Sequence, residues 1–158
     1  MTECNAEQLE FHALGKRAVV GNFDGGMISS DGGALLLGEV EAGTRIIERL
    51  AGLFVDYRDP EAIEHSVRDL VGQRVFALAL GYEDLNDHDR LRLDPLLAVL
   101  VGKNDPTGQD RFFERDKGKA LASSSTLNRL ELTPPDAKAD ARYKKIVAKP
   151  EGMDRLLV

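Results

Sequence analysis

The 158-residue sequence holds one cysteine and lacks any long apolar run. Cys4 therefore has no partner for an internal disulfide and cannot form a thiolate metal cage alone. The longest apolar stretch, residues 93–101, is interrupted by Asp94 and is far shorter than the roughly 20 residues of a membrane-spanning helix. Residues 1–14 also lack the basic and apolar segments of a secretory signal. We therefore expect a cytoplasmic protein without a membrane segment.

An overall positive charge is lacking as well. The net charge is −6, which disfavours a general binder of polyanions. The charge is uneven, because residues 1–102 hold nine Lys/Arg against eighteen Asp/Glu, whereas residues 103–158 hold twelve against nine. Counterion release requires clustered cations, so any contact with a phosphate backbone is expected in the C-terminal part.

Strand-like and turn-like patterns open the chain. Residues 17–23 are rich in β-branched and aromatic side chains, and Asp24-Gly25-Gly26 has the turn chemistry of a tight hairpin into residues 27–30. The sequence therefore predicts a short β-hairpin over residues 17–30.

Residues 31–102 predict four helices. Apolar residues recur at spacings of four and three from Leu36 to Phe54, which indicates one helix of about 20 residues, with Ser30 or Asp31 as its cap. The second helix begins at Asp59-Pro60-Glu61, ends at Gly81 and is expected at the centre of the core. A third, short one is capped by Asn86, and the fourth runs from Asp94-Pro95 to Gly102.

The remaining residues predict a loop and further helices. Residues 103–118 are polar and aperiodic. One of Ser123, Ser124 and Ser125 then caps a short helix, and Thr133 caps another that starts at Pro134-Pro135. The chain ends within a periodic apolar run at residues 156–158, which we interpret as a truncation.

Together these patterns predict a mainly α chain with a short N-terminal β-hairpin and a bundle of about five to six helices. Its expected parts are a flexible N-terminus (1–15), the hairpin with a helical core (16–102), the loop (103–118) and a C-terminal helical segment (119–158).

The densest polar cluster is the acidic stretch of residues 83–89. A hydrolase hypothesis assigns Asp84, Asp87, His88 and Asp89 to a divalent metal, because carboxylates and imidazole are suitable ligands. Adjacent acids in a turn point in different directions, however, and acids at a helix start serve as caps. We therefore favour capping, and predict neither catalytic residues nor metal ligands in this chain.

Two segments favour contact with nucleic acid. The helix after residue 123 offers Ser124, Thr126 and Arg129 near an N-terminus, where hydroxyls, amides and the helix dipole suit a phosphate. The basic run at residues 142–145 adds Arg142, Lys144 and Lys145. These six residues are the predicted DNA-binding set. The alternatives are that the serines only cap the helix and that the basic run is only a solvated surface.

Three blocks carry a resemblance to a known family: Phe23-Asp-Gly-Gly with Ser29-Ser-Asp-Gly-Gly-Ala-Leu-Leu-Leu, then residues 81–95 (GYEDLNDHDRLRLDP), then residues 121–131 (LASSSTLNRLE). In order and spacing they resemble the opening of bacterial insertion-sequence transposases with the group 1 DDE domain. The resemblance spans residues 23–131.

That resemblance implies DNA transposition by an RNase H-like α/β domain, in which two aspartates and a glutamate hold two Mg²⁺ ions. It also implies insertion-sequence ends as the DNA partner and a possible homodimer. The family's first catalytic aspartate lies in a pattern like Asp-x-Asp-x-Thr-Asp-Asp, which this sequence lacks. We therefore expect a segment truncated before the catalytic domain, with no cofactor of its own.

Two functional hypotheses follow. The first is a non-catalytic transposase segment that binds DNA ends or dimerises. The second is a structural or interaction module, or a remnant gene product, whose apolar surface packs on the absent catalytic domain without binding DNA.

Overall fold

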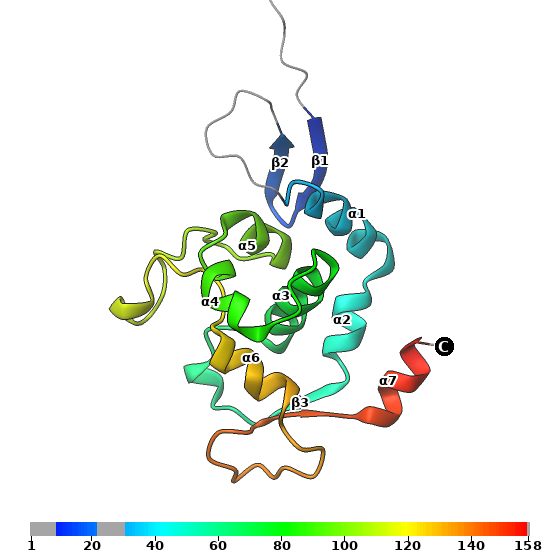
Figure 1. Cartoon of the computed structure of the whole chain (residues 1–158), viewed down its shortest axis with the longest axis vertical. Coiled ribbons are helices and arrows are strands. Elements are labelled where there is room, and N and C mark those ends of the chain that lie inside the picture. The colour runs from blue at the N-terminus through cyan, green and yellow to red at the C-terminus, as the bar shows by residue number, and fades with distance from the viewer. Residues whose placement is uncertain (1–8, 22–30, 158) are drawn as a thin grey trace, which may run out of the picture.

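The computed structural model describes residues 9–21 and 31–157 (Figure 1). The prediction of a mainly α chain is confirmed. Within the described ranges there are seven α-helices, three short 3₁₀ helices and two small antiparallel sheets. In that part of the chain, no helix is long and apolar enough to cross a membrane.

The α-helices are α1 (Ala34–Thr44), α2 (Ile46–Ala51), α3 (Val67–Ala79), α4 (His88–Leu91), α5 (Pro95–Val101), α6 (Ser124–Glu131) and α7 (Pro150–Leu157). The 3₁₀ helices are η1 (Pro60–Ala62), η2 (Leu85–Asp87) and η3 (Glu114–Asp116). The strands are β1 (Leu9–Leu14), β2 (Arg17–Gly21), β3 (Phe54–Asp56) and β4 (Ile146–Ala148).

The described residues contain an N-terminal hairpin that was not predicted. Strand β2 pairs with β1, within the segment that was predicted to be flexible. The turn lies at Gly15-Lys16, where Gly15 adopts φ +64, a conformation that glycine tolerates best. The predicted turn and partner strand, residues 24–30, lie outside the described residues. A strand partner on the N-terminal side was missed because residues 9–14 alternate only weakly.

The predicted 20-residue helix is broken into α1 and α2. Arg45 separates them with φ 52, in the left-handed region, and its amide donates to the Glu41 carbonyl at 2.8 Å. The Glu41 carboxylate then accepts from the amide of Ile47 at 2.9 Å, which restarts the helix. The apolar spacing continues after Arg45, so a prediction from periodicity alone runs the helix through this break.

The second helix begins later than predicted. Asp59 does cap a turn, accepting from the amide of Glu61 at 3.1 Å, but that turn is only η1. Helix α3 starts after Ser66, whose hydroxyl accepts from the amide of Asp69 while the Asp69 carboxylate accepts from the amide of Ser66, both at 3.1 Å. This capping box satisfies two otherwise unpaired amides and sets the true start. The predicted end at Gly81 is confirmed by its φ of +93.

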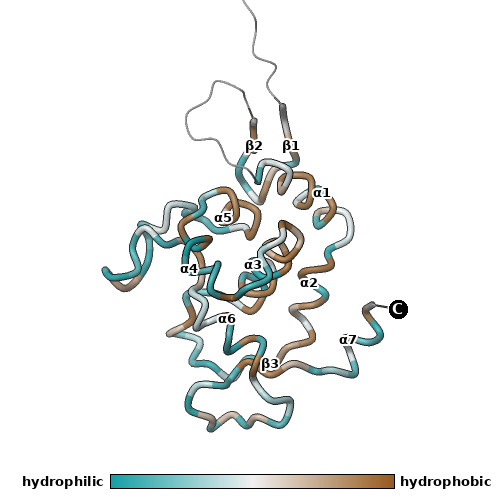
Figure 2. The backbone as a smooth tube through the Cα atoms, in the orientation of Figure 1, coloured by the Kyte–Doolittle hydropathy of each residue, from teal (hydrophilic) through white to brown (hydrophobic). Residues whose placement is uncertain are grey.

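Helix α3 lies at the centre of the molecule, in contact with α2, α5 and α6 (Figure 1). Figure 2 colours the apolar residues of α2, α3 and α5 brown, whereas the segment after α6 is mostly hydrophilic. The largest fully buried apolar side chains are Leu70, Leu97, Leu121, Leu127, Ile146 and Val101. They place α6 firmly on this core through Leu127.

The C-terminal segment was predicted to be helical, but it is not helical throughout. No helix starts at Pro134-Pro135, and residues 132–145 form bends and turns. Strand β4 follows and pairs with β3 in the register Val55 to Val147, so two β-branched residues far apart in sequence hold the chain back on the core. Helix α7 then lies beside α2 (Figure 1).

Candidate nucleic-acid interface

The N-terminus of α6 is held by a carboxylate from another segment. Ser123 is the N-cap residue, but its side chain makes no capping bond and lies 3.0 Å from the Ser125 hydroxyl and 3.3 Å from that of Thr126. Asp89 accepts instead from the amide and the hydroxyl of Ser124, at 3.1 and 2.9 Å. These hydrogen bonds lower the pKa of Asp89. Asp89 therefore fixes α6, and the remaining hydroxyls gather at its first turn.

The two predicted DNA-binding segments meet beside α6. Ser124, Arg129 and Lys144 line one open depression of about 430 Å³, together with Leu85, Asn86, Ser125, Asn128 and Tyr143. We call this depression the tyrosine groove. The guanidinium carbons of Arg129 and Arg142 lie 5.7 and 4.9 Å from the centre of the Tyr143 ring, within the range of a cation–π contact. The Lys144 ammonium donates to the Leu132 carbonyl at 2.9 Å.

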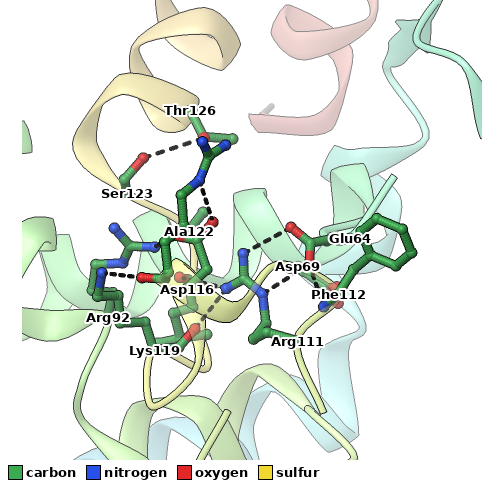
Figure 3. A network of polar contacts seen from close by, with 12 residues as sticks. Glu64, Asp69, Arg92, Arg111, Phe112, Asp116, Lys119, Ala122, Ser123 and Thr126 are labelled. Atoms are coloured by element: carbon green, nitrogen blue, oxygen red, sulfur yellow. Dashed lines mark hydrogen bonds and ion pairs between the residues drawn. The ribbon is translucent and has the colours of Figure 1, made fainter. Parts of the chain in front are cut away.

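A second depression of about 380 Å³ shares Ser125 and Arg129 with the tyrosine groove and is rich in arginine. Its lining contains five arginines against two carboxylates: Arg58, Arg92, Arg111, Arg115 and Arg129 with Glu64 and Asp116. We call it the arginine pocket. Ser123, Ser125 and Thr126 line it from the first turn of α6. In Figure 3, Arg92 and Arg111 lie below the hydroxyls of Ser123 and Thr126.

Ion pairs hold part of this pocket in place (Figure 3). Arg111 bonds both oxygens of Glu64, at 3.1 and 2.9 Å, and also donates to the Lys119 carbonyl. The hydrogen bond from Arg111 lowers the pKa of Glu64, so this carboxylate stays charged. Arg92 donates to Asp116 at 3.2 Å.

The structure brings together most of the predicted set. Ser124, Arg129 and Lys144 share the tyrosine groove, and Thr126 and Arg129 face the arginine pocket. Arg142 reaches the rim through Tyr143. Lys145 lines neither depression, although its carbonyl accepts from the amide of Tyr57 at 2.8 Å.

Sequence reasoning missed Tyr143 and four of the pocket arginines. Arg58, Arg92 and the pair Arg111 and Arg115 come from three separate segments, so no local pattern joins all four. The one available signal was the run Arg111-Phe-Phe-Glu-Arg115, in which two cations flank two aromatic residues.

A comparison with known families agrees with the resemblance seen in the sequence. The model of the family described as transposase DDE domain group 1 matches residues 11–155, nearly the whole chain. The chain belongs to this family. No curated protein and no solved structure matches it. The family places the chain in DNA transposition, and the prediction of a DDE transposase family is confirmed.

DDE transposases use Mg²⁺, and the residues of the acidic stretch do not fit such a site. Asp84 accepts from the amide of Asn86 at 2.8 Å as the cap of η2, a role that had been predicted for Asn86 itself. Asp89 is bound to Ser124, and His88 is fully buried beside Gln73. Over residues 9–21 and 31–157, no group of three His, Cys, Asp or Glu residues could hold a metal ion. The acidic stretch therefore supports no metal-dependent step.

Proposed function

We propose that this chain is a non-catalytic, DNA-contacting part of a DDE transposase and that it binds the ends of the mobile element. The observation that carries the proposal is the meeting of two distant segments at the tyrosine groove, where Ser124 and Arg129 of α6 lie beside Tyr143 and Lys144. Arg129 of α6 and the basic run at residues 142–145 converge on one face and provide the clustered cations that phosphate contact requires.

The chemistry of the groove suits a nucleic-acid backbone. Hydroxyls and arginines are common donors to phosphate oxygens, and these contacts fix the position of a protein on the duplex. Tyr143 is 58% exposed and holds two guanidinium groups near its ring, which keeps their charge at the surface. The overall charge of −6 limits nonspecific attraction, so binding depends on this local cluster.

A gel-shift experiment tests the proposal with the 158-residue chain. The probes are a duplex with the terminal repeat of the element and a scrambled duplex, each at several salt concentrations. We expect retardation of the terminal repeat at low salt, with log Kobs falling linearly with log salt concentration. Lys144→Ala should lower the magnitude of that slope by about 1, as expected for one lost phosphate contact.

Lys138→Ala is the matched control. Lys138 is exposed in the same 132–145 segment but lines neither depression, and its replacement removes the same charge. Equal losses in Lys138→Ala and Lys144→Ala would mean that only net charge matters. No retardation of either probe at low salt would refute the proposal.

A second candidate function is an interaction module, either as a homodimer or against a catalytic domain. It is favoured by α1, where Leu36 and Val40 are 64% and 57% exposed one helical turn apart. Light scattering after gel filtration would detect a dimer, and Leu36→Glu with Val40→Glu should then restore the monomer. A monomeric wild-type chain would count against the dimer.

A further inference from the structure

The arginine pocket contains more positive charge than its own carboxylates neutralise. Arg58 is engaged by both oxygens of Asp56 and by the His65 carbonyl. Arg111 is engaged by Glu64 and two carbonyls. These two arginines have structural partners, so they build the wall of the pocket.

The other three pocket arginines keep unused donors. Arg92 bonds Asp116 through one terminal nitrogen, but its buried Nε has no partner among the described residues. Arg115 has a side chain that is 79% exposed and lies 3.5 Å from Asp116. Arg129 is exposed and contacts only the ring of Tyr143 at 5.7 Å in the described part of the chain. The exposed donors of Arg115 and Arg129 are available to a ligand with several acceptor oxygens, and Arg92 adds a largely buried charge beside them.

A buried histidine in the same lining gives an independent indication of a ligand. His65 is only 6% exposed, yet neither ring nitrogen has a hydrogen-bond partner among the residues described. Burial lowers the pKa of His65 to about 3, with Lys103 and Arg111 adding to the effect, so the ring is neutral and keeps one N–H donor. Buried polar groups are nearly always paired, and an unpaired one is commonly explained by an absent water or ion.

The first turn of α6 adds the remaining donors. The hydroxyls of Ser123 and Thr126 lie 3.3 Å apart and face the pocket, and α6 is eight residues long. The positive end of its dipole favours an anion at this position, although Asp89 already accepts from the amide of Ser124. Guanidinium groups, hydroxyls and a neutral N–H are all donors, so the ligand must be rich in acceptors.

We propose that the arginine pocket binds a phosphate group through Arg92, Arg115 and Arg129, with the hydroxyls of Ser123 and Thr126 and the ring of His65 completing the site. Under the proposed function, on which this assignment rests, the group is a phosphodiester of the DNA backbone. DNA then contacts two adjacent depressions, the tyrosine groove and this pocket, which share Ser125 and Arg129. Guanidinium groups suit the site because their planar donors match phosphate oxygens.

A titration with inorganic phosphate tests the pocket independently of DNA. The imidazole resonances of His65 and the amide resonances of Ser125 and Thr126 are followed by NMR, with chloride at equal ionic strength as the reference. We expect saturable shifts with phosphate and none with chloride. Arg115→Ala and Thr126→Val, tested separately, should each weaken phosphate binding, the arginine variant by about tenfold or more.

Arg49→Ala is the charge-matched control, because Arg49 is exposed on α2 and lines neither depression. It should leave phosphate binding unchanged, as should Lys144→Ala. Both Arg115 and Arg49 are exposed, so these replacements leave the core intact. Absence of saturable shifts, or equal binding by Arg115→Ala and the wild type, would overturn the site.

The gel-shift assay then separates the two possible sources of phosphate. If the ligand is a DNA phosphodiester, Arg115→Ala should reduce the salt slope for DNA by about 1, additively with Lys144→Ala. Saturable phosphate binding without any DNA retardation would sustain the pocket as a site for a free phosphate and sink the proposed function. DNA retardation with an unchanged slope in Arg115→Ala would overturn the assignment of the pocket to DNA.

Discussion

Gln73 lies fully buried on α3 and joins three segments of the chain. Its side-chain oxygen accepts from the amide of Ala122, and its nitrogen donates to the Ala122 carbonyl, both at 2.9 Å. The same nitrogen lies 3.0 Å from Nδ1 of His88. Since the segment before α6 has no strand or helix partner at Ala122, this one amide replaces the missing backbone pairing. It therefore positions the first turn of α6, where both depressions meet.

Replacing Gln73 with leucine should destabilise the fold strongly. Leucine has a similar volume but leaves the buried N–H and carbonyl of Ala122 unpaired, each of which costs about 1–3 kcal/mol. We expect the free energy of unfolding to fall by about 2–4 kcal/mol in urea titrations followed by circular dichroism.

Gln109→Leu is the matched control for that measurement. Gln109 is exposed in the loop, so the same replacement there should change stability by no more than about 0.5 kcal/mol. If Gln73→Leu proved as stable as Gln109→Leu, the buried amide would have no structural role.

At the scale of elements, the loop at residues 103–118 is more ordered than its composition suggests. Asp105 accepts hydrogen bonds from Thr107, Gln109 and Asp110. The hydrogen bond from the Thr107 hydroxyl contributes most to lowering its pKa, to about 2. The amide of Gly118 donates to the Gly108 carbonyl at 2.9 Å and closes the loop. These contacts order the loop that places Arg111 and Arg115 in the lining of the arginine pocket.

Two glycines in this loop allow a paired test. Both have a left-handed φ, +69 at Gly108 and +78 at Gly118. A Cβ at Gly108 would lie 2.5 Å from the backbone nitrogen of Ala120, whereas one at Gly118 would meet only a side-chain nitrogen at 3.9 Å. Gly118→Ala should therefore cost about 1–2 kcal/mol for its conformation alone.

Gly108→Ala adds a backbone clash to the same conformational cost, so the loss of stability should exceed that of Gly118→Ala by at least about 1 kcal/mol. Urea unfolding of the two variants provides the measurement. If the backbone around Ala120 can shift freely, Gly108→Ala will lose no more stability than Gly118→Ala. That outcome would contradict the close approach of the two backbone segments in the structure.

The elements that sequence patterns predicted well are those with local signals. Helix α5 lies where Asp94-Pro95 and Gly102 indicated, because the cap, the first turn and the left-handed end involve only neighbouring residues. Strands β3 and β4 were not predicted, since each has three residues and pairs with a partner about 90 positions away. The break at Arg45 was missed for another reason: the apolar periodicity of a helix does not reveal a single residue with a left-handed backbone conformation.

The residues of the candidate site also differ in whether a local sequence pattern reveals them. The hydroxyls of α6 and the basic run at 142–145 were visible as local clusters, and the structure places Arg129 next to Tyr143. The arginine pocket was not visible, because four segments from Arg58 to Arg129 supply its lining. Only the packing of those segments around α3 creates it.

Two buried neutral histidines link the stability of the fold to pH. His65 is 6% exposed and His88 is 0% exposed, and burial lowers their pKa values to about 3 and about 4. Both folded-state values lie below the ordinary 6.5, so the unfolded chain binds more protons below pH 6.5. The full stability with neutral histidines is present above that pH and is lost as the pH falls.

We therefore expect the free energy of unfolding to decrease from about pH 6.5 towards about pH 5, with a slope of up to about 1.4 kcal/mol per pH unit for each histidine. Carboxylates with lowered pKa values, such as Glu64 and Asp89, act in the same direction but at lower pH, below about 4.5. Urea titrations across this window therefore measure mainly the two histidines.

The contribution of His65 can be isolated by its replacement. His65→Gln removes one titrating group, so the slope should fall by about half even if the variant is less stable at every pH. A phosphate ion in the arginine pocket would favour the protonated ring and raise the pKa of His65, so saturating phosphate should also flatten the wild-type slope. If phosphate flattens the slope of His65→Gln just as much, the anion acts elsewhere than beside this ring.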